Sequence, residues 1–440
     1  MKKNRRHRRE LRHLSLACLV ALGLSCSGSS SKDADGAPDS SWDAGADTGD
    51  DSGTNTDTGS DSDSDADGDA DTDSDTDGDA DLDAGGDAGE DAGPDSGNDA
   101  GIDSGPSQSG CIEGTFLPFH GNLHAHTGAS DGTGSATEAF AYARDSGHLD
   151  VMAVTDHLEQ LYTVVGTPSG KLEACQNAAD AVTVDGTYVA LCGFEYTSGY
   201  GIAGSTGHNN VFFANGLFPW LQPDFHDFYN TVRNPSACPD CVVQFNHPLD
   251  EASMHWNHFQ YDAAVDAKMN LFEFNGTGPT FDTLFQALDK GWHVSPTNNE
   301  DNHAVDWGTK GGGRTGLWLA DLSRDSVHAA MKERRTFMTR DNDATIRLMA
   351  QTTCWMGSIL SGYPSVSFDV EAWDSEAGDG FSTIELFGPG KTLLQTMDCA
   401  GADTCSGSYD LGVSGATYVV ARANQADGDF LVSAPVWVEP

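Results

Sequence analysis

One stretch of this 440-residue chain is kept out of any packed fold by its composition. Residues 27–110 consist almost entirely of Asp, Gly, Ser, Ala and Thr, with 26 acidic residues against one lysine. Because large apolar side chains are so scarce, the segment cannot bury enough surface to offset the entropy lost on ordering, and it is predicted to be disordered. Repulsion between its carboxylates should extend it into a linker. The folded core must therefore come from residues 111–440.

The same stretch contains a sequence similar to a calcium loop. Between Asp61 and Asp81 the pattern D-x-D-x-D-G matches the first part of an EF-hand loop. A complete loop also ends in a Glu and lies between two helices, and the sequence here provides neither. We therefore favour a solvated spacer over a specific calcium site.

Residues 1–26 have the organisation of an export signal. Five arginines precede a short apolar run, Leu14 to Leu24, whereas a membrane-spanning helix needs about 20 apolar residues. The run LGLSC (residues 22–26) resembles a bacterial lipobox, although Gly23 stands where a branched aliphatic residue is usual. The resemblance implies a lipid on Cys26 and, with Ser27 after it, a lipoprotein of the outer membrane or cell surface. The alternative is ordinary cleavage, which gives a periplasmic or secreted protein.

The charge distribution limits the partners. Residues 111–440 hold 41 acidic and 15 basic residues, so the folded part is itself acidic. A nucleic-acid-binding protein needs a basic face, and none is expected here. We expect a small-molecule ester substrate, no nucleic acid, and contact with a membrane only through the lipid anchor.

Eight cysteines follow residue 110, and an even number in an oxidising compartment predicts disulfides. Short spacings make Cys399–Cys405 and Cys238–Cys241 plausible, which leaves Cys175–Cys192 and Cys111–Cys354, but the sequence does not determine the pairing. The Cys-Pro-Asp-Cys stretch is also compatible with a redox or zinc pair. A structural role is favoured, because there is no second C-x-x-C and no thioredoxin-like βαβ pattern around it.

Strand and helix patterns alternate from residue 114. A capping box, Ser135 to Glu138, opens a helix, and a second helix fits residues 281–289. Repeated βα units of this kind suggest a barrel. The predicted strands are 116–123, 150–155, 188–194, 210–213, 242–245, 270–274 and 292–295.

The last part of the chain has a different pattern. From residue 345 short strands with alternating apolar residues follow one another without helices, which suggests a small β-sandwich. Trp355, Trp373 and Trp437 are expected to pack in or beside its core, and a carbohydrate-binding face is the alternative. The predicted organisation is a signal (1–26), a linker (27–110), an α/β domain (111–343) and a sandwich-like domain (344–440).

Side chains that bind metal ions recur at the ends of the predicted strands. The strand at 116–123 leads into an H-x-H pair whose two side chains point the same way in an extended chain. One edge of a βα barrel carries the active site, so these side chains should lie together. The candidates are His124, His126, Asp131, His157, Glu195, His208, His247, Asp301 and His303.

Six motifs, in this order, resemble those of a known family. They are HGNLHAHTGASDG (120–132), VTDH (154–157), GFEYT (193–197), GHNN (207–210), FNHP (245–248) and NNEDNH (298–303). Together they resemble the PHP family, the polymerase and histidinol phosphatase superfamily of metal-dependent hydrolases, over about residues 114–340. The export signal and C-terminal extension are most similar to the carbaryl-hydrolase-like branch, whose members cleave carbamates.

The resemblance implies a distorted, TIM-like (βα)7 barrel and two or three divalent ions, which we expect to be Zn, Mn or Fe because the ligands are nitrogen and oxygen. Asp131 stands where many members have a histidine, which favours a binuclear centre. Whether His208 and His303 bind a third ion, contact substrate or donate a proton stays open. The implied ligands are His124, His126 and Asp301 for one ion, Asp131, His157 and His247 for a second, and Glu195 as the bridge.

The implied activity is hydrolysis by a metal-activated hydroxide, most directly of a phosphoester. Asp301 would accept a proton, and His303 or His208 would protonate the leaving group. Lys310 and Arg314, in the glycine-rich stretch KGGGR, either bind an anionic substrate or are solvated loop charges. The alternatives are a hydrolase of carbamates or carboxylic esters and a non-catalytic metal-binding surface lipoprotein.

Overall fold

The structure is a computed structural model that describes residues 110–197, 207–220, 225–248, 256–274, 279–376 and 378–440. The predicted export signal, Cys26 and the acidic linker lie outside these residues. Within the described segments, no helix combines the length and the apolar character needed to cross a bilayer.

The first sheet of the α/β part runs in the order β3-β2-β1-β9-β10. Its first three strands pair in parallel, and β9 and β10 are antiparallel to their neighbours. All four residues of β2 are buried, as expected for a parallel strand covered on both faces. The strands are β1 (Leu117–Asn122), β2 (Val151–Val154), β3 (Val189–Cys192), β9 (Arg314–Leu319) and β10 (Thr336–Thr339).

The second sheet, in the order β4-β5-β6-β7-β8, carries most of the aromatic core. β5 is antiparallel to both β4 and β6, whereas β6, β7 and β8 are parallel. These strands are β4 (Phe194–Thr197), β5 (His208–Phe212), β6 (Val242–Asn246), β7 (Met269–Phe274) and β8 (Ser295–Asn298).

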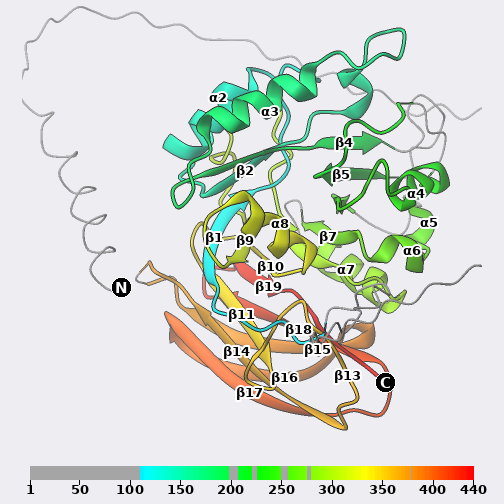
Figure 1. Cartoon of the computed structure of the whole chain (residues 1–440). Helices are drawn as coiled ribbons and strands as arrows, with labels where there is room; N and C mark the ends of the chain where they lie inside the picture. The colour runs from blue at the N-terminus through cyan, green and yellow to red at the C-terminus, as the bar shows by residue number, and fades with distance from the viewer. Residues whose placement is uncertain (1–109, 198–206, 221–224, 249–255, 275–278, 377) are drawn as a thin grey trace, which may run out of the picture. The chain divides into compact units, whose positions relative to one another are not determined.

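Helices lie on the outside of the two sheets (Figure 1). α2 begins at the predicted capping box, where Ser135 and Glu138 accept from each other's backbone, and it ends at Asp145. The helices are α2 (Ala136–Asp145), η1 (Leu158–Leu161), α3 (Lys171–Val182), α4 (Phe225–Arg233), α5 (Trp256–Phe259), α6 (Ala263–Asp266), α7 (Pro279–Asp289) and α8 (Arg324–Lys332).

The predicted (βα)7 barrel is not confirmed. The two sheets meet where Gly193 joins β3 to β4, and where Ser295 of β8 lies 2.7 Å, hydroxyl to hydroxyl, from Thr336 of β10. The described strands nevertheless form two mixed sheets rather than one parallel barrel. The reason is that β4, β5 and β6 pair antiparallel, and antiparallel neighbours do not require the crossover helix of a βα unit.

The C-terminal part is rich in strands, as predicted, and has two layers around one core. In β14 every second residue is buried, from Val366 to Ala372, so one face of the strand points into the core. One layer is the sheet β12-β11-β14-β17: β12 (Cys354–Trp355), β11 (Thr345–Ala350), β14 (Ser365–Trp373) and β17 (Thr404–Gly412). The other contains β13 (Ile359–Ser361), β15 (Phe381–Gly388), β16 (Thr392–Ala402), β18 (Thr417–Gln425), β19 (Phe430–Ser433) and β20 (Val436–Glu439), with η3 (Pro389–Lys391) between β15 and β16.

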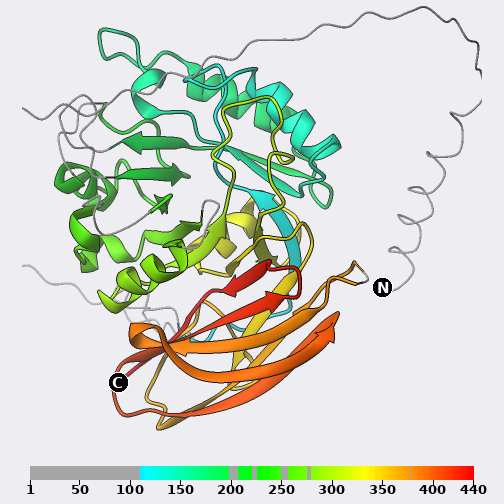
Figure 2. The ribbon, with the colours of Figure 1, turned by 180° about the vertical axis from the view of Figure 1, so that it is seen from behind.

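The second layer is continuous with the α/β part. β19 pairs antiparallel with β10, with Phe337 opposite Ser433, so one hydrogen-bonded sheet runs from the sandwich to β3 (Figure 2). The division of the chain at residues 343 and 344 stays a prediction, since backbone hydrogen bonds cross it.

The eight cysteines form four disulfides. The pairs are those that the spacing made plausible, with Cα–Cα separations between 4.9 and 6.0 Å, inside the usual range. Cys238 and Cys241 bond to each other, which removes the zinc alternative for that stretch. The disulfides are Cys111–Cys354, Cys175–Cys192, Cys238–Cys241 and Cys399–Cys405.

The tryptophans of the C-terminal part pack inward. Trp355 and Trp437 are buried, and Trp373 lies with its ring centre 5.8 Å from that of Trp318 in the α/β part. They therefore fill the core and the junction instead of forming an exposed binding face.

Candidate metal centre

The polar ends of the strands converge on one site. The H-x-H pair follows β1, and a backbone hydrogen bond of 2.9 Å from the His126 N–H to the Asn302 carbonyl ties it to the loop after β8. A β-bridge joins His157, after β2, to Glu195 in β4. Residues that follow or belong to strands of both sheets are therefore brought together at one site.

Glu195 lies at the centre of this site. It is 1% exposed, and the Asn246 amide donates to Oε1 at 2.8 Å. Burial by itself would raise the pKa of Glu195, but the charge of His124 and hydrogen bonds from the histidines lower it well below the usual value. Five ring nitrogens surround the carboxylate: His208 Nδ1 at 3.0 Å, His157 Nδ1 at 3.1 Å, His126 Nε2 at 3.3 Å, and His124 Nε2 and His247 Nε2 at 3.4 Å.

Asp301 and the H-x-H pair form the first ligand group. Asp301 Oδ1 lies 3.1 Å from His126 Nε2 and 3.3 Å from His124 Nε2, and the two Nε2 atoms are 3.2 Å apart. Burial lowers the pKa of His126, but hydrogen bonds to Asp301 and Glu195 raise it to about 9. Three donor atoms that converge in this way are suited to a shared cation.

Asp131 forms a second, more open group with three histidines. Its carboxylate lies 3.3 Å from His303 Nε2, 3.6 Å from His157 Nε2 and 3.8 Å from His126 Nδ1. The Asp131 side chain is 46% exposed and that of His303 is 38% exposed, so this group is the one that solvent reaches. A third group combines His157, Glu195 and His208.

The residues present fit divalent cations. In each group one ligand atom per residue lies within 4.8 Å of the others. Asp301 Oδ1 and His157 Nδ1 are buried without a partner in hydrogen-bond geometry, although charged atoms lie about 3.1 Å away. Close polar atoms that do not satisfy each other are expected where an ion belongs. The donors are nitrogen and oxygen, and the eight described cysteines are all in disulfides, so the set suits Zn, Mn or Fe.

Two of the site residues have strained backbones. Asp301 has a φ of 45° and His247 a φ of 34°, values that residues other than glycine rarely adopt. Such strain is retained only where the surroundings enforce it, and it is frequent at functional sites.

Glu273, in β7, supports the site, and the sequence motifs did not identify it as a site residue. It is fully buried, and its carboxylate lies 2.9 and 3.1 Å from His124 Nδ1. It also accepts from the Asn299 amide and from the His247 backbone N–H, each at 2.9 Å. A carboxylate on Nδ1 fixes the ring and leaves Nε2 free to bind a metal. The signal available was a lone Glu inside the buried strand sequence LFEF.

Asp156 organises the loop that carries Asp131. It accepts from the Thr127 backbone N–H at 2.7 Å, from the Thr127 hydroxyl at 2.7 Å and from the Ser130 hydroxyl at 2.5 Å. The sequence motif contained Asp156 next to His157, but only the structure assigns it this role.

The two predicted substrate-binding cations differ. Arg314 is 5% exposed, and its guanidinium donates to the carbonyls of Gly308, Gly311 and Gly313 at 2.7 to 3.1 Å. It therefore holds the glycine-rich loop, and a contact of Arg314 with substrate stays a prediction. Lys310 is exposed, and its Nζ lies 3.3 and 3.4 Å from the carbonyls of Glu300 and Asp301, beside the first ligand group.

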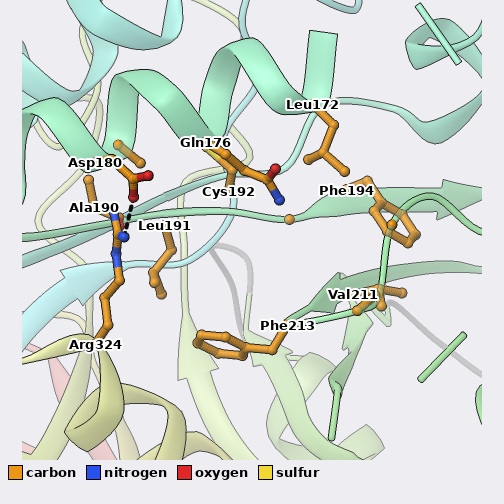
Figure 3. A pocket seen from close by; sticks show the side chains of 14 residues that line it. Leu172, Gln176, Asp180, Ala190, Leu191, Cys192, Phe194, Val211, Phe213 and Arg324 are labelled. Carbon is orange, nitrogen blue, oxygen red and sulfur yellow. Dashed lines mark hydrogen bonds and ion pairs between the residues drawn. The ribbon is translucent and has the colours of Figure 1, made fainter. Parts of the chain in front are cut away.

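Another hollow, of about 150 Å³, lies away from these ligands (Figure 3). α3 covers it with Leu172 and Gln176, and an ion pair between Arg324 and Asp180 closes one end. None of the candidate metal ligands lines it.

Comparisons with known proteins add little. No family model and no curated protein matches the sequence. A two-domain protein from Bacteroides vulgatus ATCC 8482, containing a predicted PHP-like metal-dependent phosphoesterase, is 16% identical over 76% of this chain and 100% of its own, with a TM-score of 0.42. The lesion-specific endonuclease PfuEndoQ from Pyrococcus furiosus is 13% identical over 49% of this chain and 56% of its own, with a TM-score of 0.31. Scores this low carry no argument about function, which therefore rests on the site.

Proposed function

We propose that this chain is an exported metal-dependent hydrolase of the PHP superfamily that cleaves phosphoesters. The observation that carries the proposal is the arrangement of five histidine nitrogens within 3.4 Å of the buried carboxylate of Glu195, with Asp301 and Asp131 on either side. The residues come from the six motifs that resemble that superfamily. We further propose that the chain belongs to the carbaryl-hydrolase-like branch of that superfamily.

In this proposal the candidate ligands hold two ions. His124, His126 and Asp301 would hold one, Asp131 and His157 the other, and Glu195 lies between them. His208 and His303 each lie in one of the groups and are available to a third ion. When bound, such ions supply positive charge to the reacting oxygen atoms and lower the pKa of a water molecule.

The remaining chemistry belongs to side chains of this chain. Asp301, whose pKa lies below its usual value because nearby histidines outweigh the effect of burial, stays ionised and can accept a proton at Oδ1. His303 is partly exposed and lies 3.3 Å from Asp131, so it can deliver a proton to a leaving group at the entrance. Lys310 supplies a cation for an anionic substrate.

Export through residues 1–26, with a lipid on Cys26 and an acidic linker up to residue 110, completes the proposal. The four disulfides support it, because disulfides persist in oxidising compartments outside the cytosol. Labelling with radioactive palmitate in a bacterial host tests it. The wild-type chain should incorporate label and a Cys26→Ser variant should not.

The activity is tested with purified protein, first stripped of metal and then supplied with Mn²⁺ or Zn²⁺. Bis-p-nitrophenyl phosphate and p-nitrophenyl phosphate serve as substrates, beside a carboxylic-ester and a carbamate panel. Turnover should require the metal and should disappear in His124→Ala. The matched control is His148→Asn, because His148 is exposed and has a φ of 53°, which asparagine tolerates.

Other outcomes would replace the proposal. Metal-dependent cleavage of carbamates or carboxylic esters without phosphoester cleavage would establish the alternative chemistry. Less than one bound ion per chain, with no turnover, would indicate a non-catalytic surface protein.

A further inference from the structure

A second cluster of carboxylates lies at the junction between the α/β part and the sandwich. Asp341 and Asp343 lie between β10 and β11, and Asp374 directly follows β14. One carboxylate oxygen from each of the three lies within 4.8 Å of the others. We call these three residues, together with Gln425 at the end of β18, the junction cluster.

The junction cluster is surrounded by more negative charge. Burial, together with Asp341, Asp343 and Asp379, raises the pKa of Asp374 to about 6, although a backbone hydrogen bond opposes the shift. Burial and Asp427 raise the pKa of Asp429 in the same neighbourhood. Arg340 contacts the outer part of this group, 3.7 Å from Asp429. Among the residues that the structure describes, no lysine or arginine forms an ion pair with Asp341, Asp343 or Asp374, although the charge of Arg314 acts on Asp341 from farther away.

Gln425 provides an independent sign of a ligand. It is 3% exposed, and its Nε2 lies 2.8 Å from Asp374 Oδ2, 3.3 Å from Asp341 Oδ2 and 3.2 Å from the Asp379 carbonyl, so the amide is aimed into the cluster. Its Oε1 is buried without a hydrogen-bond partner, and so is Asp343 Oδ1. Buried acceptors without partners are rare in native proteins, and each needs an explanation. Rotation of the amide by half a turn would add Oε1 to the carboxylates.

We propose that the junction cluster binds a calcium ion through Asp341, Asp343, Asp374 and the Gln425 side-chain oxygen. The carbonyl oxygen of Asp379 is close enough to join them. All of these donors are oxygen, which selects hard cations and disfavours zinc. Calcium is preferred to magnesium because calcium accepts irregular sets of carboxylate, amide and carbonyl ligands, whereas magnesium demands a near-ideal octahedron.

The ion would connect three segments that are far apart in sequence. They are the loop after β10, the end of β14 and the end of β18. The first adjoins the metal centre, because the Asn298 side chain donates to the Thr339 carbonyl at 2.7 Å and Asn298 begins the NNEDNH motif. Calcium would thus stabilise the junction on which the loop of Asp301 rests, and this role does not depend on the proposed hydrolysis.

Thermal unfolding of the full chain, first stripped of metal with EGTA, then freed of the chelator and loaded with zinc, tests the proposal. Addition of 5 mM CaCl₂ should raise the melting temperature by at least about 3 °C, and MgCl₂ should have a smaller effect. In Asp374→Asn the calcium effect should be lost, while the calcium-free melting temperature should not fall, because a repelling charge is removed. The matched control is Asp410→Asn, an exposed carboxylate on β17 that should keep the full calcium effect.

The controls distinguish this site from others. The proposal is overturned if calcium does not shift the wild-type melting temperature, or if the shift survives in Asp374→Asn, which would assign the effect to the acidic linker. If Asp374→Asn does not fold, Gln425→Leu takes its place, and equilibrium dialysis should then show one fewer bound calcium per chain. His124→Ala should keep the calcium effect, so loss of hydrolysis does not count against the junction site.

Discussion

The two polar clusters of this molecule are built on opposite principles. Around Glu195, carboxylates alternate with histidines, so each negative charge has a nitrogen neighbour within about 3.4 Å. In the junction cluster, carboxylates face one another, and the groups that donate hydrogen bonds to them are neutral: the Gln425 amide, backbone N–H groups and the Ser375 hydroxyl. The histidines of the first can bind either protons or metal ions, whereas the second contains no histidine and would be neutralised by the proposed calcium ion.

This difference predicts which ions each cluster binds and how the affinity for those ions changes with pH. Protons and metal ions compete for the histidine nitrogens, so metal affinity there must rise with pH. The junction cluster offers only oxygen donors, so no histidine proton competes with a cation there. Four substitutions or changes of condition should separate the two clusters, and they are ordered here by expected effect.

The largest effect is expected for Glu195→Gln. The substitution keeps the shape but removes the charge that five histidine nitrogens contact. Loss of several kcal/mol of charge stabilisation corresponds to a fall in kcat/KM of about 10³-fold or more. Steady-state kinetics and elemental analysis measure the result, with at least one ion per chain lost.

The calcium-dependent rise in melting temperature serves as the internal control for Glu195→Gln. It should be unchanged, because the junction cluster does not use this residue. If kcat/KM falls by less than tenfold, Glu195 does not bridge ions and the comparison of the two clusters is wrong.

The second largest effect is expected for a substitution of Glu273. This residue is proposed to position His124 and not to contact the substrate. In Glu273→Gln, the new amide N–H₂ group would point either at the Asn299 amide and the His247 backbone N–H, which are themselves donors, or at His124 Nδ1. In the second case the side chain would no longer fix the tautomer of His124 that leaves Nε2 free for a metal. We expect a loss of about 10- to 100-fold in metal affinity and in kcat. A residue with only a structural role would lower the melting temperature without this change. Excess Zn²⁺ should restore part of the activity of Glu273→Gln but none of that of Glu195→Gln.

The convergence of the candidate metal ligands was predictable from the sequence, whereas the residues that support them were not. The H-x-H pair and the Asp301-x-His303 pair stand in polar runs after buried strands, and such runs are visible in one sequence. Glu273 and Asp156 act through long-range hydrogen bonds, 149 and 29 residues from their partners. No local pattern encodes such contacts.

The fold shows the same limit. Most of the predicted strands overlap observed ones, and α2 began at its capping box. The strand predicted at 292–295, however, overlaps β8 only at Ser295, and the run 188–194 did not separate β3 from β4. The antiparallel direction of β5 could not be predicted, because the same apolar run fits a parallel or an antiparallel strand. The contacts of Arg314 were not predictable for a related reason, since the carbonyl oxygens that accept hydrogen bonds from its guanidinium come close only after folding.

The third effect is on the pH dependence of stability in metal-free protein. His126 has a pKa of about 9 in the folded state against about 6.5 when unfolded, so its contribution is complete below pH 6.5 and is lost as the pH rises through 9. We expect the free energy of unfolding to fall by on the order of 2 kcal/mol between pH 6.5 and 9.5, measured by urea denaturation with EDTA.

The junction cluster titrates elsewhere, which makes the profile diagnostic. The pKa of Asp374 is raised to about 6, so its unfavourable charge appears between about pH 4 and 6 and is constant above that. In His126→Gln the slope above pH 6.5 should flatten, and in Asp374→Asn it should not. A slope that stays the same in His126→Gln would show that other groups cause it.

The smallest effect is expected for Lys310→Gln. The ammonium group is exposed, so its attraction for an anion is weakened by solvent, and KM for a phosphomonoester should rise roughly three- to fivefold with little change in kcat. KM for a neutral carboxylic ester should not change, because no anion is bound. Lys332→Gln is the matched control, since Lys332 lies at the end of α8, pairs with Asp240 and is not one of the candidate ligands. An equal rise in KM for both substrates would show that Lys310 stabilises the loop, as Arg314 does. The negative charge of the substrate would then be bound by the metal centre and not by Lys310.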